Sequence, residues 1–226
     1  MNFKRVKTIM AYFIMPLFFS LIGIGIVILL FSPFLKSAIS IGNAVTGNVN
    51  TRSNKVYQLY DEELAIKTAN TIEEMNLESI ELSDISMPTN STQYGKIYCD
   101  RVGFLAPLFF GDDSNILRLG VGQYIGSSMP GFGKPILLCG HNTSYCLPMQ
   151  YMEVGDVLCI STNYGLFEYT INDLRVLNMS DPTAFNLNKN EEELILYTCY
   201  PFDLIGAKTD RLFIYAKKTN GPSVSY

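Results

Sequence analysis

An uncharged segment near the start of the chain constrains the fold more than any other feature. Lys4, Arg5 and Lys7 are followed by the run Thr8–Leu35, which contains no charged side chain. A helix needs roughly 20 apolar residues to cross a bilayer core, and this run is longer. A cleaved signal peptide has an apolar core of about 7–15 residues and a small-residue cleavage site, which does not follow here. The run therefore predicts an uncleaved transmembrane helix at residues 9–35.

The basic residues around this segment predict its orientation. All three N-terminal basic side chains lie in residues 1–8, and only Lys36 follows the segment closely. Positively charged flanks favour the cytoplasmic side of a membrane. We expect a cytoplasmic N-terminus, a single pass through the plasma membrane and a domain outside the cell. A buried core helix is the alternative, which the length of the run disfavours.

Residues 36–93 predict a linker followed by a stalk helix. Gly, Asn, Ser and Thr are frequent in Ser37–Asn54, as is typical of connecting segments. Small and apolar side chains then repeat at helical spacing, which predicts a helix from about Val56 to Met75.

Residues 94–220 predict an all-β domain with few short helices. Short apolar runs alternate there with Gly, Pro, Asn and Asp. Such a pattern is typical of a closed barrel or a sandwich. Residues 221–226 would be a C-terminal tail. The candidate strands are Lys96–Val102, Ile116–Leu119, Ile136–Cys139, Val157–Ser161, Phe167–Ile171, Arg175–Leu177, Leu194–Thr198 and Leu212–Ala216.

Charge and cysteine content exclude some classes of function. Beyond the N-terminal segment, 14 basic residues stand against 21 acidic ones, a net charge of −7. A nucleic-acid partner is not expected, because backbone binding needs clustered Lys and Arg. The five cysteines form no CxxC pair, and their odd number leaves at least one free. We expect unpaired thiols, since a chain of this length can build its core without disulfides.

Three residues could act together in covalent catalysis. The single histidine, His141, follows the apolar run in PILLCGHNTS, and Cys199 ends the run in ELILYTCYPF. Arg211 opens RLFIYAKK, twelve residues after Cys199. Each side chain would project from a strand end, and a barrel can bring such ends to one rim. A thiolate is a nucleophile, an imidazole exchanges its proton, and an arginine stabilises an oxyanion. On residue types alone, a buried thiol without chemical function remains the alternative.

A zinc site is a second alternative. Cys139, His141 and Cys146 are close in sequence, and thiolate with imidazole suits zinc. Their spacing matches no common zinc pattern, and a fourth ligand is missing. We therefore expect neither a metal nor another cofactor.

Three segments resemble the sortases, the cysteine transpeptidases of Gram-positive cell surfaces. They are GKIYCDRVG, LRLGVGQYIGSSMPGFGKPILLCGHN and ELILYTCYPFDLIGAKTDRLFIYAKK. The resemblance runs from about Tyr94 to Lys218, and LYTC is similar to the T-L-x-T-C strand of the family. TCYPF followed by DRL is most similar to class D members. The resemblance implies a closed eight-stranded sortase-like β-barrel, and an anchor with its N-terminus inside the cell also fits the family.

The resemblance also implies a role for each site residue. Cys199 would form an acyl-thioester, His141 would be the general acid and base, and Arg211 would stabilise the oxyanion or orient the substrate. Thr198 would support the substrate, and the backbone N–H of Tyr200 would donate to the oxyanion. The implied reaction cleaves an LPxTG-like sorting motif and transfers the acyl half to an amine of a cell-wall precursor or another surface protein.

Two other functions use the same residues differently. A surface module with a sortase fold could bind peptides without cutting them, although the presence of all three site residues disfavours this. A secreted cysteine protease would share the thioester but use water as the acceptor, and only the resemblance separates it. One departure concerns Cys139, which lies two residues before His141 and on the same strand face, where many relatives carry a small residue.

Overall fold

The computed structural model describes residues 15, 18–24, 57–203 and 206–225. The chain divides into two compact units, residues 1–42 and 43–226. In the first unit, residues 18–24 are helical. Among the described residues, no helix is both long and apolar enough to cross a membrane. Most of the predicted transmembrane segment, residues 9–35, lies outside the described residues.

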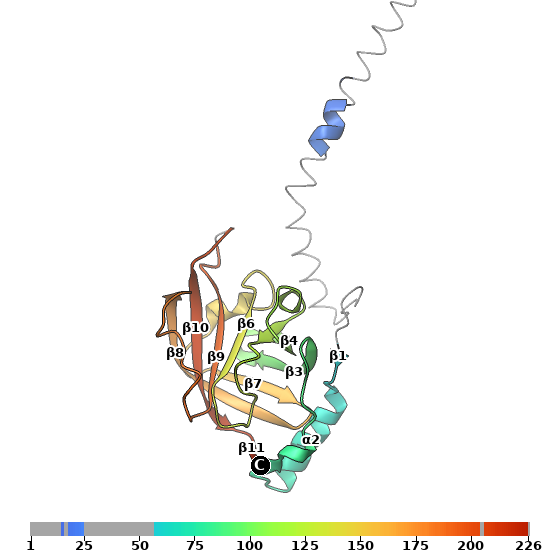
Figure 1. Cartoon of the computed structure of the whole chain (residues 1–226), viewed down its shortest axis with the longest axis vertical. Helices are drawn as coiled ribbons and strands as arrows, with labels where there is room; N and C mark the ends of the chain where they lie inside the picture. Colours follow the sequence, from blue (N-terminus) through green and yellow to red (C-terminus); the bar gives the residue numbers. More distant parts are fainter. Residues whose placement is uncertain (1–14, 16–17, 25–56, 204–205, 226) are drawn as a thin grey trace, which may run out of the picture. The chain divides into compact units, whose positions relative to one another are not determined.

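The second unit is built on a closed β-barrel, shown in Figure 1. The strands pair in the order β3-β4-β5-β6-β9-β10-β8-β7, and β7 pairs with β3 to close the ring. This confirms the predicted eight-stranded barrel. A short strand, β1, adds to β3 outside the ring. The bounds are β1 Tyr57–Gln58, β3 Thr92–Cys99, β4 Phe104–Phe110, β5 Val121–Gln123, β6 Ile136–Gly140, β7 Val157–Thr162, β8 Gly165–Asn178, β9 Glu193–Tyr200 and β10 Asp210–Asn220.

The predicted helix exists but begins later than expected. Helix α2 spans Glu62–Glu74 and packs against β7 and β8. Its N-cap is Asp61, whose carboxylate accepts hydrogen bonds from the backbone N–H groups two and three residues further on. Such a cap stabilises a helix by about 1 kcal/mol. Strand β1 occupies the first part of the segment that was predicted to be helical.

One predicted strand is wrong. Ile116–Leu119 is not a strand, because η3 (Ile116–Arg118) is a 3₁₀ turn. Asp113 accepts hydrogen bonds from the backbone N–H groups of Asn115, at 2.8 Å, and Ile116, at 3.2 Å. These local bonds turn the chain before it can pair with a neighbour.

Other boundaries also differ from the expected ones. β4 was not among the candidate strands, and the two candidates Phe167–Ile171 and Arg175–Leu177 belong to the single long strand β8. Three further 3₁₀ turns and a short parallel pair of strands complete the unit. Their bounds are η1 Leu82–Asp84, η2 Asp100–Val102, η4 Leu147–Tyr151, β2 Ser79–Glu81 and β11 Ser223–Ser225.

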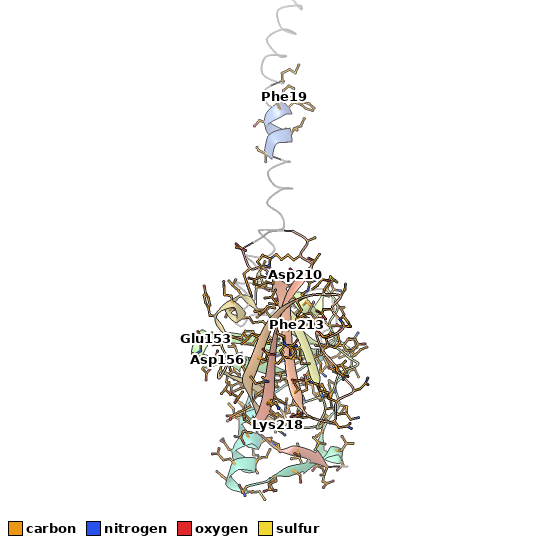
Figure 2. The ribbon with its side chains drawn as sticks, turned by 90° about the vertical axis from the view of Figure 1, so that its left-hand side faces the viewer. Phe19, Glu153, Asp156, Asp210, Phe213 and Lys218 are labelled. Carbon is orange, nitrogen blue, oxygen red and sulfur yellow. The ribbon has the colours of Figure 1, made fainter. Side chains whose placement is uncertain are left out.

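Alternating side chains divide the sheet into two faces. Leu196 on β9 and Ile214 on β10 point into the main core. Ile195, Phe213 and Tyr215 form a second cluster on the outer face, together with residues of β6 and of the β8–β9 connection. Figure 2 shows β10 running from Asp210 at one end, past Phe213, to Lys218 at the other. Each strand therefore has an inner row and an outer row, and both continue to its ends.

The beginning of β9 is held by a buried carboxylate. Glu192 accepts hydrogen bonds from the backbone N–H groups of Gly131, at 3.0 Å, and Gly133, at 2.9 Å. The Tyr169 hydroxyl donates to it at 2.6 Å, and the Lys218 Nζ atom lies 4.0 Å away. Burial, together with this carboxylate, raises the pKa of Tyr169 well above its usual value. Burial lowers the pKa of Lys218, and Glu192 opposes that change.

Candidate active site

The sheet register brings His141 and Cys199 to neighbouring strand ends. β6 and β9 are parallel, and Gly140 lies opposite Thr198. His141 directly follows Gly140 at the end of β6, and Cys199 directly follows Thr198 in β9. Both side chains therefore leave the sheet on the same outer face, and both are half-buried.

Arg211 lies on the other side of Cys199. The two residues are direct partners in the antiparallel pair of β9 and β10. Directly opposed residues share a face, with Cβ atoms about 4.5–5.5 Å apart. The Arg211 Nη1 atom donates to the carbonyls of Lys208, at 2.8 Å, and Asp210, at 2.9 Å. Among the described residues, no carboxylate lies within ion-pair distance of Arg211, so its charge is available to a ligand.

The surroundings of His141 favour a neutral imidazole. Burial lowers its pKa from the ordinary value, and the positive charge of Arg118 on η3 lowers it further. The Arg118 guanidinium is in turn hydrogen-bonded to the side-chain oxygen of Asn115. A neutral imidazole can accept the proton of a thiol, which is the first requirement for a Cys–His pair.

Asn142 is the residue that the sequence interpretation missed. The residue is 4% exposed, and its Nδ2 atom donates to the carbonyls of Cys199, at 2.8 Å, and Pro201, at 3.1 Å. The motif GHN placed an amide next to the histidine, but its two acceptors are 57 and 59 residues away in the chain. Only the fold reveals this contact.

Thr198 and Tyr200 occupy different environments. Thr198 is 1% exposed, and its hydroxyl donates to the Gly140 carbonyl at 2.7 Å, which ties β9 to β6. Tyr200 is 38% exposed, and its ring meets Phe202 edge to face, with centroids 6.3 Å apart. Both aromatic residues line an open pocket of about 400 Å³. The other lining residues are Leu147, Gln150, Pro201 and Asp203.

All five cysteines are free thiols. Burial raises the pKa of Cys139 to about 11, although a hydrogen bond with Tyr197 opposes this effect. Cys146 is fully buried, and burial raises the pKa of its thiol well above the ordinary value. Within the described part of the chain, no three His, Cys, Asp or Glu side chains are grouped so as to hold a metal ion.

Comparison with known proteins identifies relatives of the whole barrel. The Sortase domain family model matches residues 97–219. The chain is 30% identical over 167 residues to Sortase D of Bacillus subtilis (strain 168), which covers 67% of this chain and 84% of that protein. Among solved structures, a Clostridium perfringens Sortase D5 transpeptidase is 22% identical, with a TM-score of 0.53, covering 70% of this chain and all of that one. Sortase C1 of Streptococcus agalactiae is 18% identical, with a TM-score of 0.53, covering 83% and 88%. At these identities the solved structures establish the shared fold.

Proposed function

The chain belongs to the sortase family, and on that premise we propose that it is a membrane-anchored transpeptidase with Cys199 as its nucleophile. One observation supports this most directly. His141, Cys199 and Arg211 lie in one row across the adjacent strand ends of β6, β9 and β10. This row holds a base, a nucleophile and a cation, the set that acyl transfer requires. The expected similarity to class D agrees with the 30% identity to Sortase D.

The proposed reaction has two halves. His141 accepts the thiol proton, and the sulfur of Cys199 attacks a backbone carbonyl of an LPxTG-like motif, between Thr and Gly or its replacement. Arg211 stabilises the negative oxygen that forms. The C–N bond then breaks, His141 protonates the departing amine, and a thioester remains. An amine of a cell-wall precursor or another surface protein attacks the thioester, gives its proton to His141 and releases the thiol with a new amide bond. Water can replace this amine slowly.

We propose different contributions for the two flanking residues. Thr198 supports the substrate indirectly, because its buried hydroxyl holds the strand pair beneath the site. The Cys199 carbonyl accepts a hydrogen bond from Asn142 and therefore points toward β6. In a trans peptide the N–H of the next residue points the opposite way. The Tyr200 N–H is thus directed toward β10, where Asp210 is the strand partner of Tyr200. Arg211 is therefore the main oxyanion donor, and the exposed Tyr200 ring binds substrate in the adjoining pocket.

We also propose that residues 9–35 anchor the chain in the plasma membrane, with the catalytic barrel outside the cell. Residues 36–93 then link the anchor to the barrel. This proposal rests on the uncharged run and the basic residues that precede it.

Intact-mass measurement on the full-length chain in detergent tests the proposed chemistry. The chain is incubated with LPxTG-like peptides, with and without an added amine. We expect a mass gain equal to the acyl half, its discharge by the amine, and no adduct on Cys199→Ala. Cys159→Ala is the matched control, since Cys159 is also a partly exposed thiol but lies on β7, and it should still acylate. Peptide binding without any bond change would identify a binding module, and cleavage with no transfer to amine would identify a protease.

A further inference from the structure

We propose that Asn142 is a positioning residue that fixes the separation of the Cys199 sulfur and the His141 imidazole. This inference rests on the proposed function, because it assigns a determinant of the Cys–His pair. Asn142 follows His141 directly in the chain, and its amide nitrogen bonds the carbonyl of Cys199 itself. One side chain therefore connects the backbone of the base to the backbone of the nucleophile.

The second bond of Asn142 extends this connection past the nucleophile. Its Nδ2 atom also donates to the Pro201 carbonyl at 3.1 Å, so the carbonyls on both sides of Tyr200 are held. Because Asn142 is 4% exposed, water competes little for these acceptors. The end of β9 is thus fixed at two points to the turn that carries the histidine.

The β-ladder does not reach the pair. Its last register position between β6 and β9 is Gly140 with Thr198, one residue before His141 and Cys199. The Thr198 hydroxyl reinforces that same position, at 2.7 Å from the Gly140 oxygen. Beyond it, the two bonds of Asn142 are the hydrogen bonds recorded between the described residues 141–146 and 199–203. Asn142 therefore holds the two segments together beyond the last position of the β-ladder, as the ladder hydrogen bonds hold them before it.

The Asn142 side chain is neutral, so replacing it can change the position of the Cys–His pair without changing the charge around it. The charged and titratable groups near His141 include Arg118 on η3, whose charge acts on the imidazole. Others share its face of the sheet: Cys139 on β6, Tyr197 and Cys199 on β9, and Arg211 on β10. Asn142→Ala removes none of these charges. A change in the interaction between the imidazole and the thiol would therefore report a change in their separation.

The single histidine of the chain provides a direct readout. The NMR shift of the His141 imidazole is followed against pH in the full-length chain in detergent. We expect a second inflection when Cys199 ionises, and its absence in Cys199→Ala. In Asn142→Ala we expect the amplitude of this inflection to fall at least twofold. We also expect kcat for transpeptidation to fall roughly 10- to 100-fold, with KM nearly unchanged, as small displacements of reacting groups cause.

Asn163→Ala is the matched control. Asn163 likewise joins distant segments, with Nδ2 donating to the Leu59 carbonyl and its side-chain oxygen accepting the Asp61 N–H, but it lies in the β7–β8 turn. We expect a lower Tm with an unchanged inflection and kcat. If Asn142→Ala does not fold, Asn142→Asp takes its place, because it keeps the size of the side chain and loses the N–H donors. The double variant with Cys199→Ala then corrects for the added charge.

Two results separate the inference from the proposed function. A wild-type chain that forms the thioester, with an unchanged inflection and kcat in the Asn142 variant, would overturn the positioning role alone. A wild-type chain with neither thioester nor a Cys199-dependent inflection would overturn the proposed function. A smaller inflection and a lower kcat in Asn142→Ala, with Asn163→Ala normal, would support both.

Discussion

The two ends of strand β9 use polar groups in opposite ways. At its beginning, Glu192 is buried and accepts hydrogen bonds from two backbone N–H groups and Tyr169, with Lys218 nearby. At its far end, Cys199 is half-buried, and no carboxylate among the described residues pairs with Arg211. Figure 2 shows Lys218 and Asp210 marking these two ends on the neighbouring strand.

The Glu192 end of β9 is expected to serve the stability of the fold, and the Cys199 end is expected to serve the proposed chemistry. A buried polar group destabilises a protein unless its hydrogen bonds are made, so the Glu192 end must be satisfied within the fold. A catalytic group must keep part of its bonding capacity for the substrate. Substitutions at the first end should therefore change stability, and substitutions at the second should change rates.

The greatest loss of activity is expected from a substitution at the Cys199 end of β9. We expect His141→Ala to lower kcat by about 10²- to 10⁴-fold, the range typical of general acid–base catalysis, with little change in Tm. Steady-state transpeptidation and thermal unfolding measure the two quantities. No second histidine can replace His141, so wild-type turnover of this variant would show that the proposed mechanism is wrong.

At the opposite end, Glu192→Ala should change stability and not chemistry. Its removal leaves the Tyr169 hydroxyl and the backbone N–H groups of Gly131 and Gly133 without their buried acceptor, and Lys218 without its neighbouring carboxylate. We expect a loss of about 3–5 kcal/mol in the free energy of unfolding. Denaturant unfolding measures this loss. Turnover per folded molecule, measured well below the Tm, should be unchanged, and a large fall in kcat would show that the two ends are not separable.

Arg211→Lys changes the side chain at the Cys199 end of β9 while keeping its positive charge. We expect kcat to fall about 10²- to 10³-fold, because an ammonium lacks the forked donors of the guanidinium, which we propose stabilises the oxyanion. Lys189→Arg is a comparison substitution at an exposed ion pair with Glu193 at the other end of β9, and it should keep normal activity. A near-normal kcat in Arg211→Lys would show that Arg211 contributes only its positive charge and not its forked donors.

The smallest expected effect is on a pKa. Burial and Arg118 both lower the pKa of His141, so Arg118→Gln should raise it, while burial still keeps it below the ordinary value. Because the neutral imidazole is the base, the acid limb of kcat/KM should move to higher pH. NMR titration of the single histidine gives the pKa directly. Arg101→Gln is the control, since Arg101 bonds Asp156 instead, and a similar shift there would argue against a local effect.

Much of the barrel could be predicted because its strands carry their own pattern. β6 and β9 are apolar runs bounded by turn residues, and each was placed to within about two residues. β5 has only three residues, including Gly122, and exists because β4 and β6 pair with it on either side. The turn at Ile116–Arg118 depends on the Asp113 carboxylate, which an apolar run does not reveal.

The candidate site likewise contains residues that the sequence indicates and one that only the fold reveals. The residue types and the family resemblance indicate His141, Cys199 and Arg211, and the register then brings them into one row. Asn142 could not be assigned, because its importance lies in two carbonyls more than fifty residues away. Side-chain chemistry is visible in a sequence, whereas the partner of a backbone atom is not.

The position of β10 has a consequence for biosynthesis. This strand lies between β9 and β8 in the sheet, yet it follows both of them in the chain. During synthesis β8 and β9 leave the ribosome before the strand that joins them. The row of site residues can therefore assemble only after β10 has emerged, and until then the nascent chain holds a thiol without the arginine that the proposed chemistry requires.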